Sequence, residues 1–410
     1  MRAFMDLRIY AWKVHKKGAF MERQIIVSVG MGPGQLDFIR FLKNKGYIVV
    51  AFGKGQNSEE AVSIVDYSCE LDTYDAEAAI KWIDSLNLHI DAVGSYAGGR
   101  AVRTVQILSN YYNVPTKVPQ ELMVSGDKRE QQLFYEKYGL SSIKTWDSKT
   151  VLKSDVSDIM DDKFIIKPMV GRGSEGIRYV NKNELLNLIG EDILKREDSV
   201  VQNVKEGKEY RCLIMVQNSE IILLTPILRK SYKNTVFLGE LSIDNSNYDR
   251  MYDFFRKFVN QAEIVNSIIK ADVIVSEREI NLIEMDIGVG GGTYYKKFVS
   301  KIYNRDIMDD YVKLLTGVII DRYTEPNKYM CMDYVYNHKG KPVKYNIDEC
   351  KKGLEGRIAN CDIIINRLHP EKSGRFMSNA DFLFVVIYEK KHESQDFWID
   401  EFINNNYLYD

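Results

Sequence analysis

Hydrophobic and polar positions alternate with two different periods along the first part of this chain. Short runs rich in β-branched residues, such as QIIVSV and YIVVAFG, are followed by longer segments in which apolar residues recur every three to four positions, such as LDFIRFLKNKG. This alternation continues from Arg23 to the helical RAVRTVQILSNYYNV, where two prolines, Pro115 and Pro119, interrupt it. The pattern predicts a small parallel α/β domain, which we place at residues 21–120.

The pattern changes after residue 120. The helical stretch SGDKREQQLFYEKYGL precedes a strand, KFIIKP, and a second helix, NKNELLNLIGEDIL, for which Asn181 or Asn183 is the expected cap. From SVVQNV to REINLIEMDI, short β-rich runs such as EIILLTPILRK are separated by polar turns, which is typical of an antiparallel sheet. After Gly317 a polar stretch around Pro326 leads to a last mixed unit, which ends in the helical SQDFWIDEFINNNY.

The composition excludes several classes of protein. The chain has 410 residues, of which 45% are hydrophobic and 28% charged, as expected for a globular protein of more than one domain. Its 56 basic and 58 acidic residues are mixed along the chain, so we expect neither nucleic acid nor a membrane as a partner. No apolar run approaches the ~18 residues of a membrane span. Five cysteines without a C-x-x-C pair and five scattered histidines leave no zinc pattern and favour a cytoplasmic location.

Residues 1–20 precede the α/β pattern and are expected to be an N-terminal extension. Their charged residues interrupt the apolar core that a signal peptide would need. Because Met21 stands directly before the first strand, an upstream-start artefact is an equal alternative.

Two glycine-rich stretches are candidates for binding phosphate. The first, VGMGPGQL, has glycines at positions 30, 32 and 34, a spacing that differs from the G-x-G-x-x-G of dinucleotide-binding domains. The next strand, YIVVAFG, also ends without the acidic residue that would hold a ribose. Two interpretations stay open: the glycines make a tight turn between strand and helix, or the helix N-terminus faces a small anionic substrate.

The second stretch, FIIKPMVGRGSEGI at residues 164–177, has its lysine before its glycines, which reverses the order of a P-loop. Lys167 would be fixed within an apolar strand. Gly171, Gly173 and Gly176 would let the following loop fold over phosphate groups, so that backbone N–H groups point inward. We therefore expect a fixed lysine followed by a mobile lid.

Five segments in this order resemble the ATP-grasp superfamily, and specifically its members with a small α/β domain in front, such as biotin carboxylase, the purine-pathway carboxylases and many carboxylate-amine ligases. The segments are VGMGPGQL, SGDKREQQLFYEKYGL, FIIKPMVGRGSEGI, VVQNVKEGKEY and INLIEMD. The resemblance covers about residues 23–318. It implies an ATP-grasp fold of mixed α/β and α+β class: a front α/β domain at 21–120, an N-terminal lid subdomain at 121–205, a C-terminal subdomain at 206–320 and a small C-terminal α/β unit at 321–410.

The resemblance also implies a site for ATP. Two lysines would neutralise the triphosphate, although Lys128 alone also fits a solvated helix lysine. The hinge segment would bind adenine partly through its backbone, and Glu209 would take the ribose or the polar network beside it. The residues implied to bind the nucleotide are Lys128, Lys167, Gly171, Gly173, Ser174, Gly176, Gln202, Asn203, Val204 and Glu209. Those implied in catalysis are Lys167, Gly173, Ser174 and Arg229.

Three acidic residues are the candidates for binding metal. Asp272 and Glu284 are twelve positions apart, which suits two adjacent strands joined by the polar turn SERE. Asp286 returns to the face of Glu284, because strand side chains alternate. Three convergent carboxylates are costly to bury without cations, so two Mg²⁺ ions, or Mn²⁺ in their place, would bridge them to the phosphates. The alternative is that they are solvated acids at strand ends.

Two positions depart from the family pattern. Asn203 stands where the family usually has glutamate, which leaves the ribose and adenine contacts open. Gly288 stands where biotin carboxylase-like members have an arginine, which argues against activation of bicarbonate and leaves room for a wider, glycine-lined acceptor pocket. Arg229 is a candidate for supplying the missing positive charge, with an exposed strand-end arginine as the alternative.

The chemistry implied is that of a carboxylate-amine ligase. ATP would convert a carboxylate into an acyl phosphate, and an amine of an amino acid or another small metabolite would then displace phosphate. The small-molecule carboxylate and amine would be the partners, and the dimers common among relatives make a homodimer one candidate assembly. Two alternatives remain: another ATP-grasp reaction through carboxyphosphate, and a non-catalytic nucleotide-binding sensor or scaffold.

Overall fold

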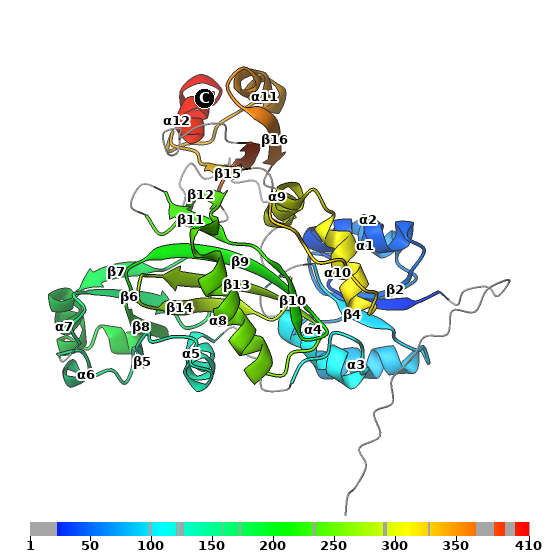
Figure 1. Cartoon of the computed structure of the whole chain (residues 1–410), viewed down its shortest axis with the longest axis horizontal. Helices are drawn as coiled ribbons and strands as arrows, with labels where there is room; N and C mark the ends of the chain where they lie inside the picture. The colour runs from blue at the N-terminus through cyan, green and yellow to red at the C-terminus, as the bar shows by residue number, and fades with distance from the viewer. Residues whose placement is uncertain are drawn as a thin grey trace, which may run out of the picture.

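The computed structural model describes residues 23–96, 98, 101–119, 122, 127–157, 159–171, 174–232, 235–289, 293–326, 329–365, 381–389 and 398–409. The extension expected at residues 1–20 and the candidate site residue Gly173 lie outside these ranges. Figure 1 shows three parts side by side: the N-terminal domain, a large sheet in the middle and a small sheet at the opposite end.

The N-terminal domain is a parallel sheet covered by helices on both faces, as the strand–helix pattern predicts. Its strands lie in the order β3-β2-β1-β4, and every pairing is parallel. The helices α1 and α2 pack on one face, and α3 and α4 pack on the other. The elements are β1 (Ile25–Val29), α1 (Pro33–Asn44), β2 (Ile48–Gly53), α2 (Glu59–Ile64), β3 (Tyr67–Glu70), α3 (Ala76–Ser85), β4 (Ala92–Gly94) and α4 (Ala101–Tyr111).

The small sheet is antiparallel, with the strand order β5-β8-β6-β7. Two helices cover one of its faces and enclose a small apolar core. Asn181, one of the two predicted caps, begins the second of these helices: its Oδ1 accepts from Glu184 N at 2.9 Å, and Asn181 N donates to Glu184 Oε2 at 2.8 Å. The elements are β5 (Thr145–Asp147), α6 (Lys153–Ser157), β6 (Lys163–Pro168), β7 (Arg178–Asn181), α7 (Lys182–Gly190) and β8 (Ser199–Asn203).

The large sheet has nine strands within the described residues, in the order β14-β13-β9-β11-β12-β15-β17-β16, with β10 also pairing with β9. Its pairings are antiparallel, as expected. The strands are β9 (Lys208–Gln217), β10 (Glu220–Leu224), β11 (Ile227–Ser231), β12 (Leu238–Ile243), β13 (Ser267–Val275), β14 (Ile280–Asp286), β15 (Met330–Val335), β16 (Ala359–Ile365) and β17 (Phe384–Glu389).

The run EIILLTPILRK is two strands and not one. The strands β10 and β11 follow each other along the same edge of β9, and the break falls at Thr225 and Pro226. Proline has no N–H to give to the ladder, whereas Thr225 remains tied to β9, because its Oγ1 accepts from Leu213 N at 2.6 Å.

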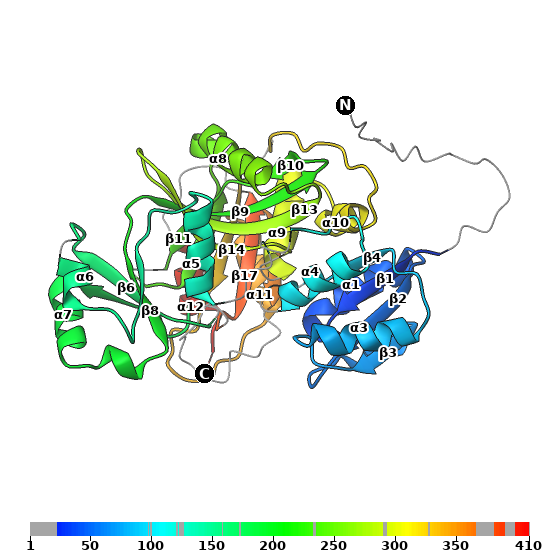
Figure 2. The same cartoon turned by 90° about the horizontal axis from the view of Figure 1, so that it is seen from below.

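Helices cover both faces of the large sheet. The helices α5 (Lys128–Lys137) and α8 (Tyr248–Gln261) pack on one face, while α9 (Thr293–Tyr303), α10 (Ile307–Leu315) and the α1 face of the N-terminal domain pack on the other. The last strands, β15 to β17, extend this sheet instead of forming one of their own, and α11 (Ile347–Glu355) and α12 (Trp398–Asn406) cover them. No helix in the described ranges is long and apolar enough to cross a membrane. The helix α5 contacts both β5 and β14, so it joins the small sheet to the large one (Figure 2).

Candidate functional site

Lys167 lies inside β6, where its residue is only 9% exposed. Burial lowers the pKa of its ammonium to about 8, against an opposing effect of the Glu284 carboxylate. Strand β6 has β7 on one side and β8 on the other, which fixes the backbone of Lys167 opposite Val200. Lys167 is therefore not a solvated surface lysine.

Lys128 is the first residue of α5, and it is tied to the end of β6. The Asp127 side chain caps the helix by accepting from Arg129 N at 2.8 Å. Lys128 Nζ donates to Pro168 O at 2.9 Å, and Lys128 N donates to Met169 O at 3.1 Å. Burial lowers its pKa as well, while Glu284 and Asp127 raise it. The two candidate lysines thus flank the same strand end, and each has a charge that its surroundings disfavour.

The glycine loop folds back onto the end of β6. Ser174 and Gly176 have positive φ angles of 61° and 70°. A Cβ at Gly176 would stand 2.9 Å from Pro168 Cγ, closer than real Cβ atoms approach, whereas a Cβ at Gly171 would meet Pro168 Cβ at an ordinary 3.5 Å. Gly176 is therefore required by the loop conformation, and Gly171 is not required by the contacts around it.

The hinge residues are largely occupied by contacts within the protein. Asn203 Oδ1 accepts from Lys144 N at 2.7 Å, and its Nδ2 donates to Asp161 Oδ2 at 2.7 Å. Gln202 Nε2 donates to Thr145 Oγ1 at 2.8 Å, and Val204 N donates to Lys163 O at 3.0 Å. Asn203 thus ties β8 to its neighbours, which gives this departure from the family pattern a structural role.

Arg229 is buried and not an exposed strand-end residue. Its side chain is 9% exposed, and its Nη1 donates to Glu209 Oε2 at 2.5 Å. Its Nη2 donates to Val236 O at 2.7 Å. Because Arg229 already holds the Glu209 carboxylate, neither side chain has all of its hydrogen-bonding capacity available for a ligand.

The structure brings the three candidate metal-binding residues to one face of two paired strands. Asp272 on β13 lies directly opposite Glu284 on β14, as the spacing of twelve predicts, and Lys270 lies opposite Asp286. Burial and the neighbouring Glu284 raise the pKa of Asp286 to about 6. Asp272 differs, because Arg211 and Lys270 already bind its carboxylate.

A divalent ion fits part of this acidic group. Within the described ranges, no set of three or more His, Cys, Asp or Glu side chains is placed to hold a metal ion. Glu284 and Asp286 nevertheless share a face, and burial together with the Glu284 carboxylate raises the pKa of Asp286 although Lys270 and Arg211 lower it, so the cations already present do not fully compensate these carboxylates. Mg²⁺ is commonly bound by one or two carboxylates together with water and substrate phosphates, so these two residues are sufficient on the protein side.

The charged groups converge from separate elements. Burial has the largest effect on the pKa of Lys167, and the charges of Glu284 on β14, Lys128 on α5, Glu209 on β9 and Arg229 on β11 act on it as well. Sequence reasoning missed Lys270 and Arg211. The signal that identified Lys167, a cation inside an apolar strand, is also present in SIIKADVIV and EYRCLIMV and could have identified both.

Gly288 lies where the N-terminal domain meets the large sheet. A Cβ at this position would stand 2.8 Å from Val102 Cγ1 on α4. Beside it, Gln106 Nε2 donates to Ile287 O at 2.6 Å. The expectation of a wider pocket at Gly288 is therefore wrong at this position, because Val102 fills the space that a side chain would take.

Near the glycine loop of the N-terminal domain, at residues 30–34, lies a buried lysine, Lys296, that sequence analysis did not identify. Gly30 has a positive φ of 105°, and Gln35 after it accepts from Tyr96 N at 2.8 Å. The ammonium of Lys296 donates to the Tyr96 carbonyl and lies 3.7 Å from the centre of the Tyr96 ring. Burial alone lowers the pKa of Lys296 to about 7. This lysine couples α9 to the carboxyl end of β4.

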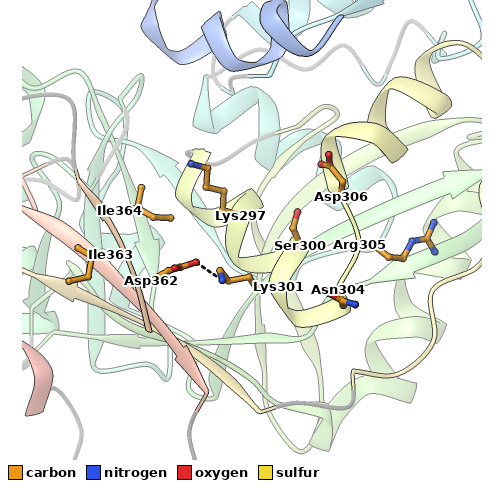
Figure 3. A pocket seen from close by; sticks show the side chains of 9 residues that line it. All are labelled: Lys297, Ser300, Lys301, Asn304, Arg305, Asp306, Asp362, Ile363 and Ile364. Carbon is orange, nitrogen blue, oxygen red and sulfur yellow. Dashed lines mark ion pairs between the residues drawn. The ribbon is translucent and has the colours of Figure 1, made fainter. Parts of the chain in front are cut away.

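A separate surface recess lies between α9 and β16 (Figure 3). It has a volume of about 590 Å³, and Lys301 and Asp362 form an ion pair across it. Arg305 at its rim is held by the Asp310 carboxylate at 2.8 Å and by Asp321 O at 2.7 Å. None of the residues predicted from sequence to bind ATP or metal lines this recess.

Comparison with known proteins identifies the fold. Residues 103–287 match the model of the ATP-grasp domain. An L-amino acid ligase from Bacillus licheniformis is similar in structure, with a TM-score of 0.70 and 12% identity over 90% of this chain and 94% of that chain. Phosphoribosylglycinamide synthetase from Anaerococcus prevotii gives a TM-score of 0.65 and 13% identity over 90% of this chain and 95% of that chain.

N5-carboxyaminoimidazole synthase from Aspergillus clavatus, solved with ADP and 5-aminoimidazole ribonucleotide, gives a TM-score of 0.65 and 11% identity over 90% of this chain and 94% of that chain. Curated protein sequences give no match. At these identities the likeness shows the fold, and the predicted ATP-grasp fold with a parallel α/β domain in front is confirmed.

Proposed function

We propose that the protein, whose residues 103–287 match the ATP-grasp domain, is an ATP-dependent ligase that joins a small-molecule carboxylate to an amine. One observation carries the proposal. Lys128, Lys167, Glu284 and Asp286 come from α5, β6 and β14, and the Glu284 carboxylate acts on the pKa of each of the other three. Lys128 Nζ also donates to Pro168 O, directly after Lys167 on β6. Fixed cations beside carboxylates are what a metal–triphosphate complex needs.

In this proposal the two lysines bind the phosphates of ATP. Lys167 and Lys128 are held at the end of β6, so they meet the triphosphate without first being ordered. The loop that includes Gly171, Ser174 and Gly176 would cover the phosphates with its backbone N–H groups. The nucleotide base would lie beside the hinge at Gln202 to Val204 and use backbone carbonyl groups, because the Asn203 side chain and the N–H groups of Asn203 and Val204 are already bound.

Glu284 and Asp286 would hold Mg²⁺, or Mn²⁺ in its place, which screens the charge of the phosphate oxygens when bound. A substrate carboxylate oxygen would then attack the γ-phosphorus, the bond to the β-phosphate oxygen would break, and ADP would leave. The amine would next attack the acyl carbon and expel phosphate, losing one proton. The chain contributes position and charge: Arg229, held by Glu209, is a buried positive charge close enough to act on Lys167.

The alternative through carboxyphosphate has less support at Gly288. Biotin carboxylase-like members of the family have an arginine there, whereas here Val102 occupies the space beside a glycine. The similarity to an L-amino acid ligase agrees with a carboxylate and an amine as substrates. We place the reaction in the cytoplasm, in agreement with the free cysteines at positions 69, 212, 331, 350 and 361.

The test is ADP release measured against a panel of carboxylate and amine pairs. We expect turnover only when both partners are present. Glu284→Gln should lower kcat by at least about 100-fold with the fold intact, because it removes one of two anionic ligands of the metal. Glu77→Gln, at an exposed position on α3, is the matched control and should behave as wild type. Nucleotide binding without turnover on a broad panel would favour the sensor, and ATP cleavage that needs bicarbonate would favour carboxyphosphate.

A further inference from the structure

The carboxylate of Asp272 is bound by two cations from the chain itself. Arg211 Nε donates to Asp272 Oδ1 at 2.9 Å, and Arg211 Nη2 donates to Oδ2 at 3.1 Å. Lys270 Nζ donates to Asp272 Oδ2 at 2.7 Å. Lys270 and Asp272 are only 4% and 5% exposed, so water hardly competes for these contacts.

The sheet register fixes this arrangement. Asp272 lies opposite Arg211 on β9 and opposite Glu284 on β14, so the three side chains occupy one face of three adjacent strands. Lys270 precedes Asp272 by two residues and therefore projects from the same face. All three strands belong to one antiparallel sheet, which makes the group rigid.

The ammonium of Lys270 stands between two of the three carboxylates predicted to bind metal. Its Nζ is 2.7 Å from Asp272 Oδ2 and 3.5 Å from Glu284 Oε1. A metal ion that bridged Asp272 and Glu284 would need this same place. The position is therefore already filled by a positive charge, and Arg211 on the far side of Asp272 adds another.

We propose that Lys270 takes the place of one of the two metal ions expected from the sequence, so that the protein binds ATP with a single divalent ion at Glu284 and Asp286. Arg211 is then a positioning residue, which holds Asp272 so that Asp272 in turn holds Lys270. This inference rests on the nucleotide site of the proposed function.

The charge balance agrees with one ion. Arg211 and Lys270 leave the three carboxylates with a net charge of minus one, so one divalent ion gives plus one. Before the charge of the triphosphate is counted, a second divalent ion would bring this group, in which the Glu284 side chain is 50% exposed, to plus three beside two cations that cannot move away from it. The second ion is therefore disfavoured unless Lys270 loses its charge or is removed.

The test measures how many metal ions each chain binds, and it does not depend on enzymatic activity. Free Mn²⁺ is measured by electron paramagnetic resonance while the full chain is titrated in the presence of a non-hydrolysable ATP analogue. We expect one bound Mn²⁺ per chain for wild type and for Lys270→Arg, which keeps the cation. Lys270→Met should bind two, because Asp272 then has only Arg211 as a partner. Lys313→Met, a lysine on the exposed side of α10, is the control and should bind one.

The outcomes separate this inference from the proposed function. Two Mn²⁺ ions per wild-type chain, with the analogue bound, would overturn the inference and leave the ligase proposal standing. One ion in a folded Lys270→Met variant would also overturn it. If calorimetry shows no binding of the analogue to the folded wild-type chain, both proposals fail. The wild-type count decides the question even if Lys270→Met does not fold, which circular dichroism checks.

Discussion

The two lysines assigned to the triphosphate lie in surroundings that disfavour their own charge. Burial lowers the pKa of Lys167 to about 8 and also lowers that of Lys128, from an ordinary value near 10.4. Each is kept charged partly by Glu284, whose charge a bound metal would offset. Both lysines therefore favour an anionic ligand, whose negative charge would stabilise their charged forms more than the protein does.

This imbalance predicts that ATP binding takes up protons near pH 8. The free protein holds a fraction of Lys167 in its neutral form at that pH, and bound phosphate raises its pKa, so a proton must be absorbed on binding. Calorimetric titration with an ATP analogue in buffers of different ionisation enthalpy measures the uptake, which should shrink below pH 7, where Lys167 is already charged.

Lys167→Met should abolish the uptake and weaken binding by at least about tenfold, because a fixed charge is lost. Lys163→Met is the matched control, since Lys163 lies on the same strand but is exposed. Uptake that persists in Lys167→Met would assign the proton to another group.

At the scale of elements, local sequence patterns predicted the strands and helices, whereas the pairing of strands far apart in the chain could not be predicted from them. The spacing of Asp272 and Glu284 was enough to place them opposite each other, because a short turn fixes the register of two neighbouring strands. The pairing of Arg211 with Asp272 spans 61 positions and depends on β9 lying next to β13. The order of strands in a sheet depends on contacts across the whole sheet, so the hydrophobic pattern of one segment does not reveal it.

Strand pairing in the C-terminal segment was hidden from sequence analysis for the same reason. Its alternation of strands and helices was visible in the sequence, but the pairing of β12 with β15 joins residues about ninety positions apart. The partner of Lys296 was equally hidden, because Tyr96 belongs to a different domain. For Lys167 the local signal sufficed, since a lysine inside an apolar strand is conspicuous by itself.

The glycine loop allows a test at this scale with a built-in control. Gly176→Ala should lower the affinity for ATP and the turnover several-fold, because the positive φ of 70° and the 2.9 Å approach to Pro168 force the loop to move. Gly171→Ala adds the same methyl group at an ordinary contact distance of 3.5 Å and should stay close to wild type. Affinity is measured by calorimetry, and unfolding should change little in either variant. Equal behaviour of the two would show that the loop conformation does not matter for phosphate.

At the scale of the whole molecule, the N-terminal domain is held against the large sheet by close contacts beside the site. Gln106 on α4 donates to the backbone just after β14, and Lys296 on α9 binds the loop after β4. Ile287, which accepts the first contact, directly follows Asp286, and Lys296, which makes the second, lies ten positions beyond Asp286. The position of the front domain is therefore coupled to the strand that carries the proposed metal ligands.

Gly288 provides the test of this coupling. Gly288→Ala should destabilise the protein by about 1–3 kcal/mol, because the new Cβ would stand 2.8 Å from Val102 Cγ1, and a β-branched side chain on a helix has little freedom to turn away. Val102→Ala alone should also destabilise, since it removes buried methyl groups.

The double variant should be more stable than the sum of the two single effects predicts, since the smaller side chain at position 102 makes room for the methyl group at 288. Urea unfolding of the wild type, the two single variants and the double variant gives the coupling energy between positions 102 and 288. ADP release by the same four proteins shows whether the active site is affected. We expect Gly288→Ala to lower turnover and Val102→Ala to restore part of it in the double variant. Additive stabilities would mean that α4 does not press on Gly288, and unchanged turnover in Gly288→Ala would mean that the front domain can shift without disturbing β14.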